Sequence, residues 1–519
     1  MQIKLEDKKY KIAIMILLAI GILIRLIDID KLPNALNVDE TSSGYEAYSI
    51  ANYGIDRNNN FMPAFLVSWG GGQNVLLTYL IIPFIKIFGL NIFSIRLPMA
   101  ILGCISLFVI FSLLNKIGNK KIAIIGLAFF AICPWHIMKS RWGLESNLFP
   151  DLILIFIYML IKGLEEKKIW FYISFVIAGI SAYAYGTSYF FLPVFIIPVL
   201  YILIKNKKIR VKDAIVWITI TAIVALPIIL YVFINTFNLN QINLPFITIP
   251  KLEVNRYKEI TSIFSKDFIN ISITNLIDGI KIIFFQTDNL PWNSLNNYGI
   301  IYLFSIIFTA IGIINAFIKN KWIEIKYNFI FNVCFIISII LMIICSPNIN
   351  RINIIWIPII YYTIIGISIV IKSDKRFLIP IAIIYSIAFI MFSRQYMNQN
   401  SDDYITFEGN LESTIKYVES IDNKDIYITN DIKEPYIYVL FYTRYNTKDY
   451  INTVKYYNQG QEFEQVKSFG KYHFEDITDI KDSEKNVYVI NKNEIDNYNI
   501  NDKWNIKEFE KYVVLEGVK

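Results

Sequence analysis

The sequence predicts an α-helical polytopic membrane protein with about eleven transmembrane helices, helices in its extracytoplasmic loops and a small C-terminal α/β domain. Three observations predict this class. The 519 residues are 55% hydrophobic and only 18% charged, which is more apolar side chain than a soluble protein of this size can bury. Apolar runs long enough to cross a bilayer recur through most of the chain. The last part, residues 395–519, is instead rich in Tyr, Asn, Asp and Lys.

Eleven apolar runs approach the length of about twenty residues that crosses the hydrocarbon core. The first run follows three lysines and no convincing cleavage site comes after it, so we expect an uncleaved first span. The candidate spans are 12–29, 94–115, 120–137, 146–164, 168–185, 187–205, 211–234, 298–319, 327–345, 352–371 and 376–393.

Basic residues gather in alternate connections between these runs, such as "KIGNKK", "KNKKIRVK" and "KSDKR", whereas "AYGT" and "SPNIN" have none. By the positive-inside rule, this asymmetry predicts a plasma-membrane protein with a cytoplasmic N-terminus. Because the chain changes sides at each of the eleven spans, the loops 30–93, 134–146 and 235–297 and the tail 395–519 are predicted to lie outside. Residues 1–394 are then the membrane domain.

A shorter apolar run, residues 75–89, contains Pro83 and Lys86. We expect it to lie in the membrane interface. If it crossed the bilayer, every later loop would change sides and the basic connections would face outward.

The tail contains four β-like runs, "DIYITN", "YIYVLFY", "NVYVIN" and "KYVVLEG", between polar stretches that are compatible with helices. This alternation predicts a small α/β domain.

The formal net charge of +7 does not indicate nucleic-acid binding, because the basic residues lie in short clusters between apolar runs. The four cysteines, Cys104, Cys133, Cys334 and Cys345, fall inside apolar runs without metal-ligand spacing. We therefore predict that they are core thiols.

Polar residues collect in the predicted outer loops and not in the spans. A transporter is expected to carry ionisable residues near the middle of its spans, but here Arg25 and Asp28 lie near the outer end of the first one. This distribution favours a functional site at the outer membrane–water interface.

The first outer loop places Asp39 and Glu40 at the head of a predicted helix, in "ALNVDETSSGYEAYSI". One interpretation is that Asp39 only caps this helix. The other is that it acts as a base, since partial desolvation at the hydrocarbon boundary raises the pKa of a carboxyl group. The adjacent helix start lowers that pKa, so the sequence leaves the balance open.

The second outer loop, "CPWHIMKSRWGLESNLFP", combines His136, Arg141 and Glu145 with two tryptophans. Arg141 and Glu145 would share a face on a helix. His136 and Glu145 are candidate ligands of a divalent metal ion, although two residues do not make a metal signature. The alternative interpretation is an aromatic belt with a local ion pair.

Other candidates for binding substrate follow along the chain. Tyr185 and Tyr189 stand at the outer junction of two spans, and Arg351 is a lone cation at the outer end of another. A positive charge there opposes the positive-inside trend, which suggests an anionic partner.

Together these segments resemble the membrane glycosyltransferases of the GT-C fold, which include the protein O-mannosyltransferases and the aminoarabinose transferase of lipid A. The resemblance covers about residues 10–395. It rests on the acidic pair, then "GIDRNNNFMPAF", "RLP", "PWHIMKSRWGLESN" and "YAYGTSYFFLP". It implies a polyprenyl-phosphate sugar donor, a lipid, protein or glycan acceptor outside the cell, and inversion at the anomeric carbon.

The resemblance also assigns residues. It implies that Asp39 is the catalytic carboxylate, with Glu40 beside it, and that Glu145 with Arg141 forms the second-loop motif, where other members carry Asp. Some relatives bind a divalent metal near the site. Lysines that neutralise the donor phosphate in some relatives have no clear counterpart here.

Inverting transfer needs a general base for the acceptor hydroxyl and positive charge for the leaving phosphate. Asp39 would supply the base. Arg141, Arg96 and Arg351 are candidates for the phosphate, since a guanidinium matches it bidentately. Two alternatives stay open: a flippase or transporter for a lipid-linked saccharide, and a polysaccharide polymerase or ligase.

Overall fold

The computed structural model describes residues 2–518 apart from 255–261, 263–264, 291, 296, 319–321, 399–406, 410, 462, 481–483, 499 and 501. The chain forms two compact units that interleave in the sequence. We call the first the helical unit; it comprises Met1–Ile29, Arg96–Ile229 and Tyr257–Tyr404. We call the second the mixed unit; it comprises Asp30–Ile95, Leu230–Arg256 and Ile405–Lys519.

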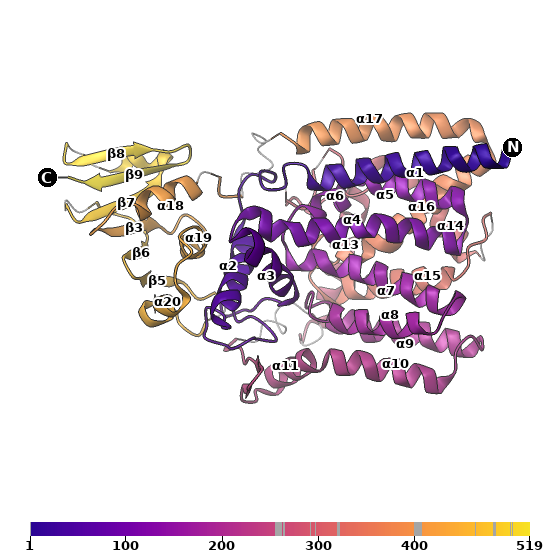
Figure 1. The fold of residues 1–519 in the computed structure, drawn as a ribbon, viewed down its shortest axis with the longest axis horizontal. Helices are drawn as coiled ribbons and strands as arrows, with labels where there is room; N and C mark the ends of the chain where they lie inside the picture. The colour runs from indigo at the N-terminus through magenta and orange to yellow at the C-terminus, as the bar shows by residue number, and fades with distance from the viewer. Residues whose placement is uncertain are drawn as a thin grey trace. The chain divides into compact units, whose positions relative to one another are not determined.

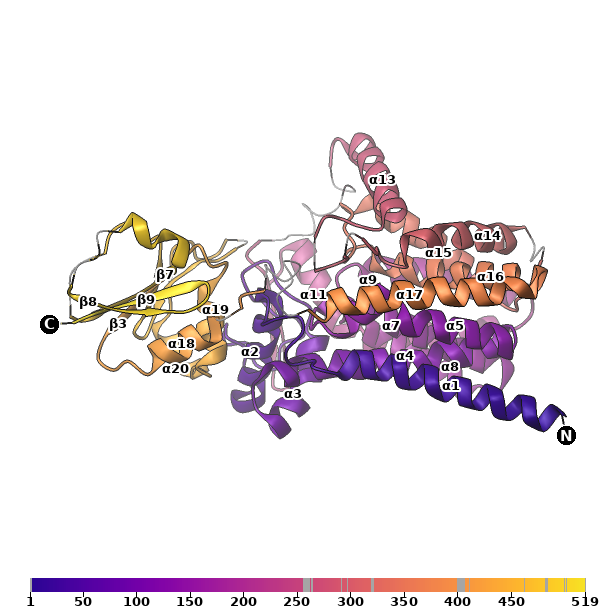
Figure 2. The same cartoon turned by 90° about the horizontal axis from the view of Figure 1, so that it is seen from above.

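The long helices of the helical unit run side by side with similar directions (Figure 1), and α13 is inclined to them (Figure 2). Each of the eleven predicted spans coincides with a helix or a bent pair of helices. Including α13, which corresponds to none of the predicted spans, the helices are α1 (Gln2–Leu26), α4 (Ile92–Ile117), α5 (Lys120–Ile132), α6 (Pro134–Ser140), α7 (Leu148–Glu165), α8 (Ile169–Ser181), α9 (Ser188–Lys205), α10 (Val211–Val224), α11 (Leu226–Phe237), α13 (Phe268–Phe285), α14 (Ile306–Phe317), α15 (Asn328–Ile344), α16 (Trp356–Ser373) and α17 (Leu378–Tyr396).

Six helices of the described residues are long and apolar enough to cross a membrane, or up to eight if each bent pair is one span. The pairs are α5 with α6, bent by 58°, and α10 with α11, bent by 67°. At the first bend Pro134 opens α6, and a proline supplies no N–H to continue the preceding helix. The count of eleven spans, and the orientation derived from it, stay predictions.

Helix α13 lies in the predicted outer loop 235–297, yet it meets the criteria for a span. This span was not predicted because polar residues interrupt the apolar run of α13. Two of them, Asp278 and Lys281, form an exposed ion pair at 2.9 Å.

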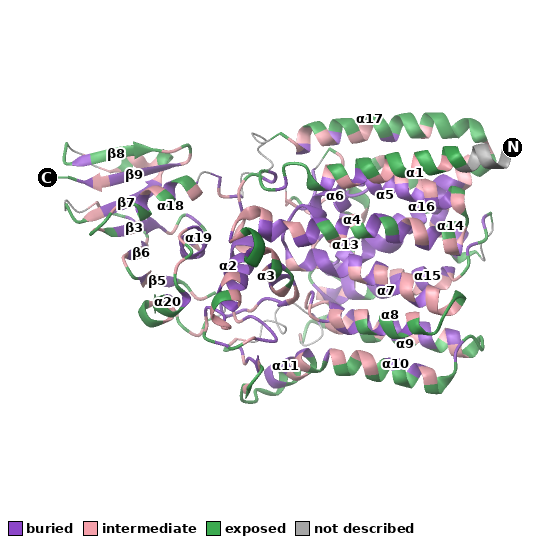
Figure 3. Cartoon of the chain, in the orientation of Figure 1, coloured by how far each residue is buried: buried purple, intermediate pink, exposed green. Residues whose placement is uncertain are grey.

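Helix α16 lies at the centre of the helical unit, with 89% of its apolar window buried, whereas only 11% of the α17 window is buried (Figure 3). Two glycines let α14 and α16 pack with their backbones in contact. A Cβ on Gly312 would lie 1.8 Å from the main-chain carbonyl oxygen of Tyr362, and one on Gly366 would lie 1.9 Å from the main-chain carbonyl oxygen of Phe308. Small residues at such crossings allow close approach of membrane helices. The four cysteines are free thiols; Cys133, Cys334 and Cys345 are buried, as predicted, whereas Cys104 is half-buried.

The mixed unit contains two helices from the first predicted outer loop, α2 (Val38–Tyr53) and α3 (Leu76–Phe88). Helix α3 coincides with the predicted interfacial run. Its thirteen residues extend about 20 Å, less than the roughly 30 Å of a hydrocarbon core. Its placement in the interface remains a prediction.

The described residues between 411 and 517 form a seven-stranded mixed sheet with three α-helices, which confirms the predicted α/β character of the tail. The strand order is β4-β5-β6-β3-β7-β9-β8. The central β3 is parallel to β6 and β7, and the other pairs are antiparallel. The elements are α18 (Leu411–Glu419), β3 (Asp425–Thr429), α19 (Pro435–Tyr442), α20 (Thr447–Thr453), β4 (Lys455–Tyr456), β5 (Val466–Phe469), β6 (Tyr472–Glu475), β7 (Asn486–Asn491), β8 (Trp504–Glu508) and β9 (Tyr512–Gly517).

Three of the four predicted strands are β3, β7 and β9, but the run "YIYVLFY" is helix α19 and not a strand. Pro435 opens this helix, and all eight of its residues are buried. A helix that is buried on every side has no polar face, so its sequence lacks the periodicity that separates a helix from a buried strand.

Candidate functional site

The first turn of α2 carries both acids of the predicted site. The N-cap residue is Asn37: its side-chain oxygen accepts the Glu40 N–H at 2.9 Å, and the Glu40 carboxylate accepts the Asn37 N–H at 3.4 Å. This reciprocal arrangement is a capping box. The interpretation of Asp39 as the cap of this helix is therefore wrong, because Asn37 has that role.

The two adjacent acids differ in their exposure to solvent. Glu40 is fully buried, whereas Asp39 is half-buried. Asp39 also lies within electrostatic reach of Tyr438 in α19. Burial raises the pKa of Tyr438, and nearby charges, chiefly Glu408 and also Asp39, raise it further. Of the two acids, Asp39 is the one that remains accessible to a substrate.

Replacing Asn37 with alanine is expected to destabilise the protein by about 1 kcal/mol, because the first-turn N–H of Glu40 loses its acceptor. The measurement is the thermal unfolding midpoint of the purified protein. Asn119, which caps α5 through two N–H groups, provides a matched Asn→Ala control. An unchanged midpoint in Asn37→Ala alone would show that the capping box does not hold α2.

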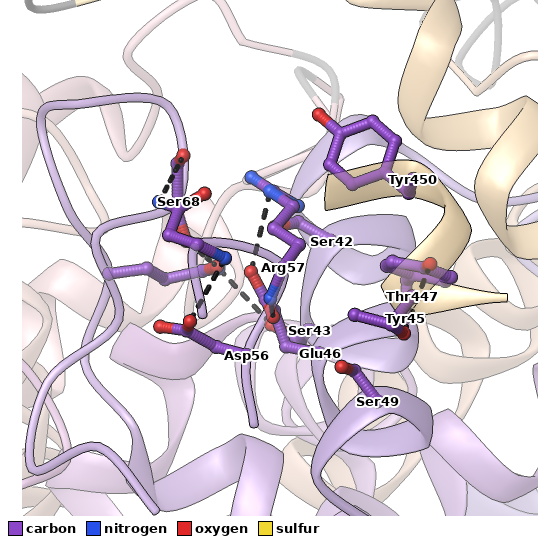
Figure 4. Close-up of polar contacts among 12 residues, drawn as sticks. Ser42, Ser43, Tyr45, Glu46, Ser49, Asp56, Arg57, Ser68, Thr447 and Tyr450 are labelled. Atoms are coloured by element: carbon purple, nitrogen blue, oxygen red, sulfur yellow. Dashed lines mark hydrogen bonds and ion pairs between the residues drawn. The ribbon is translucent and has the colours of Figure 1, made fainter. Parts of the chain in front are cut away.

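A buried ion pair forms beyond the first turn of α2 and was not predicted (Figure 4). Glu46 and Arg57 are both buried. The Arg57 Nε lies 3.4 Å from Glu46 Oε1, and the Arg57 backbone N–H donates to Glu46 Oε2 at 3.0 Å. Arg57 Nη1 also donates to the Ser42 hydroxyl at 3.0 Å. The sequence feature that could have indicated this ion pair is the acid and arginine at positions 56 and 57, inside the segment "GIDRNNNFMPAF".

Burial dominates the electrostatics of this cluster. It raises the pKa of Glu46 to about 7, although Arg57 opposes the shift. Burial likewise raises the pKa of Asp56 to about 6, against hydrogen bonds from Asn60. The Asp56 carboxylate accepts the Asn60 N–H at 2.7 Å and its side-chain amide at 3.0 Å. Asp56 therefore shapes the turn that presents Arg57.

In the helical unit, four buried side chains form a continuous polar chain. Arg25 donates to His136 Nδ1 at 2.6 Å, which leaves the proton on Nε2, 3.1 Å from Asp151 Oδ1. Lys139 donates to the other Asp151 oxygen at 2.5 Å. Arg25 also donates to the carbonyls of Phe130 and Ala131. The chain joins α1, α5, α6 and α7.

This arrangement bears on the prediction that His136 and Glu145 bind a divalent metal ion. Both ring nitrogens of His136 are hydrogen-bonded, Nδ1 as acceptor and Nε2–H as donor, so neither nitrogen is available to a metal ion. Within the described part of the chain, no group of three or more His, Cys, Asp or Glu side chains is placed to hold one. The donor set that the sequence suggested, His136 with Glu145, does not fit a metal site.

Arg141 and Glu145 do not share a helix, contrary to the prediction. Helix α6 ends at Ser140, Arg141 is its C-cap, and a separate 3₁₀ turn begins at Glu145. The Arg141 guanidinium donates to the carbonyls of Ile24, Ile27 and Asp28 at 2.9, 2.7 and 3.2 Å. It therefore holds the C-terminal end of α1, where the carbonyls lack partners within the helix.

The remaining predicted residues also lie in the helical unit. Arg96 is buried and donates to the Ile29 carbonyl at 3.2 Å. Arg351 is half-buried and donates to the Ser346 carbonyl at 3.1 Å. Tyr185 and Tyr189 are half-buried on either side of the start of α9.

The chain resembles known proteins in part of its sequence and in its fold. Residues 73–234 match the family model described as dolichyl-phosphate-mannose-protein mannosyltransferase, which covers less than half of the chain. None of the curated proteins matches the sequence significantly. ArnT from Cupriavidus metallidurans, bound to undecaprenyl phosphate, superposes with a TM-score of 0.57 at 10% identity, covering 96% of this chain and 97% of ArnT. The chain has the GT-C fold.

Two structures of the Archaeoglobus fulgidus oligosaccharyltransferase share this GT-C fold. The complex with Zn and sulfate gives a TM-score of 0.53 at 13% identity, covering 83% of this chain and 61% of the other. The complex of AglB with an inhibitory peptide and a dolichol-phosphate gives 0.52 at 12% identity, covering 84% and 64%. This chain thus spans less than two thirds of the archaeal protein. The resemblance inferred from the sequence motifs is confirmed.

Proposed function

We propose that the protein is an inverting glycosyltransferase that moves a sugar from a polyprenyl-phosphate donor to an acceptor hydroxyl on the outer face of the plasma membrane. The observation that carries this proposal is the GT-C fold over almost the whole of both chains in the comparison with ArnT, with a half-buried acid, Asp39, at the start of α2. ArnT is bound to undecaprenyl phosphate and AglB to a dolichol-phosphate, which supports a lipid-phosphate donor here.

In the proposed reaction, Asp39 accepts the proton of the acceptor hydroxyl while the oxygen of that hydroxyl attacks C1 of the sugar. The bond between C1 and the phosphate oxygen breaks, and its electron pair leaves with the carrier phosphate. A general base within hydrogen-bond reach is the group this displacement requires. The phosphate is a good leaving group without a proton, so a second carboxylic acid is not needed, in contrast to glycoside hydrolysis.

Glu40 and the cations have supporting roles in this scheme. Glu40 holds the first turn of α2 through Asn37 and so fixes the residue beside it. Arg141, Arg96 and Arg351 are proposed to bind the donor phosphate, and Tyr185 and Tyr189 to contact the donor. Each of these arginines also donates at least one N–H to a main-chain carbonyl.

The decisive experiment supplies the purified protein with a panel of polyprenyl-phosphate sugars and an acceptor mixture. The proposal expects release of the carrier phosphate together with a new glycosidic bond. Movement of the intact lipid-linked saccharide across vesicles, with no new bond, would identify a flippase instead. Chain growth by repeated addition would identify a polymerase, since the proposed enzyme adds one sugar.

A further inference from the structure

Helix α2 is attached to the C-terminal segment on both sides of Asp39. Before the helix, the Leu36 carbonyl accepts the Glu408 N–H at 3.3 Å and lies 3.5 Å from the Tyr438 hydroxyl. Within the helix, the Tyr45 hydroxyl donates to the Tyr445 carbonyl at 2.9 Å. The two attachments therefore lie three residues before Asp39 and six residues after it.

The packing between these attachments leaves no free space. A Cβ on Gly44 would lie 2.8 Å from the Phe441 ring of α19 and 2.6 Å from the Ile95 side chain. Real Cβ atoms do not approach other atoms this closely, so only glycine lets α2 approach α19 to this distance. Tyr45, the next residue, is fully buried. Helix α2 can neither slide nor rotate without breaking these contacts.

The buried ion pair fixes the far side of the same helix. Arg57 holds Glu46 and Ser42, while its guanidinium lies 4.8 Å from the Trp69 ring and 5.7 Å from the ring of Tyr436 in α19. One side chain thus joins α2, the loop that follows it and α19. A buried arginine with aromatic neighbours is a strong and directional contact.

We propose that α19 and the turn that follows it, residues 443–446, position Asp39 for catalysis. The C-terminal segment is then a working part of the transferase and not an appendage. This inference rests on the proposed function, because it assumes that Asp39 is the base. Tyr45 is a positioning residue in this scheme: it acts through α2 and does not touch the substrate.

The test compares two tyrosine substitutions that each remove one hydrogen bond from a hydroxyl to a main-chain carbonyl. Tyr45→Phe removes the 2.9 Å bond to Tyr445 together with a 3.3 Å contact to the Thr447 hydroxyl, whereas Tyr498→Phe removes the 2.7 Å bond to Ile477 inside the C-terminal segment. Both variants are expected to lose thermal stability, and Tyr45→Phe the more, because Tyr45 is fully buried and Tyr498 is half-buried. Only Tyr45→Phe is expected to lower kcat, by about fivefold or more at an unchanged KM for the donor, because small displacements of a catalytic group are costly.

Hydrogen–deuterium exchange of residues 38–45 gives a readout that does not depend on activity. Exchange is expected to rise in Tyr45→Phe and to stay at the wild-type rate in Tyr498→Phe. Wild-type kcat in Tyr45→Phe, or an equal loss of kcat in both variants, would overturn the inference while the proposed function stands. If the wild-type protein forms no glycosidic bond, the proposed function fails, and the exchange experiment alone decides whether the C-terminal segment holds α2.

Discussion

Asp39→Asn is expected to lower the rate of sugar transfer by about 10²- to 10⁴-fold, the usual contribution of a general base. Asparagine keeps the size of the side chain but has no basic oxygen that can take the acceptor proton. Asn37 caps α2 and Asp39 does not, so the substitution is expected to leave the helix and the amount of folded protein unchanged. The measurement is the single-turnover rate of the purified variant with the donor that the wild type uses.

Asp30→Asn is the matched control, because Asp30 is an exposed aspartate nine residues before the proposed base. It is expected to transfer sugar at the wild-type rate. Glu40→Gln extends the comparison to the adjacent acid and is expected to affect stability more than kcat, since Glu40 takes part in the capping box. A normal rate in Asp39→Asn would remove Asp39 from the mechanism. A normal rate in that variant together with an inactive Glu40→Gln would transfer the role to Glu40.

Asp151→Asn is expected to destabilise the helical unit by about 3–5 kcal/mol, the usual result of removing one partner from a buried ion pair. The Asp151 carboxylate is fully buried and accepts from both His136 and Lys139. Without it, the charge of Lys139 stays buried with no acid beside it. A loss of this size is a large part of the 5–15 kcal/mol that typically stabilises a protein.

The unfolding midpoint of purified protein measures this effect, and Asp213→Asn is its control. Asp213 also pairs with a basic residue, Arg210, through two hydrogen bonds of 2.8 and 3.0 Å. The Arg210 side chain is 58% exposed, and an ion pair that is exposed to water contributes little to stability. If the two variants unfold at the same temperature, the buried chain from Arg25 to Asp151 does not stabilise the bundle.

The sequence by itself determined the features that depend on local composition and spacing. Apolar runs located the helices, because burial in a membrane requires a continuous apolar segment. The β-branched and aromatic runs at β3, β7 and β9 located those strands, and the acids at 39 and 40 indicated the start of α2. In each case the residues that decide the structure are neighbours in the chain.

Tertiary structure alone decided the features that depend on residues far apart in sequence. The assignment of α19 as a helix follows from its burial on every side, which hides helical periodicity. The hydrogen bonds from Arg141 to carbonyls at the end of α1 connect residues that are separated by 113 to 117 positions in the sequence. The bond from Tyr45 to Tyr445 spans 400 positions. Such contacts depend on how whole helices and strands pack together. A local pattern of residues does not indicate which distant residue will contact it.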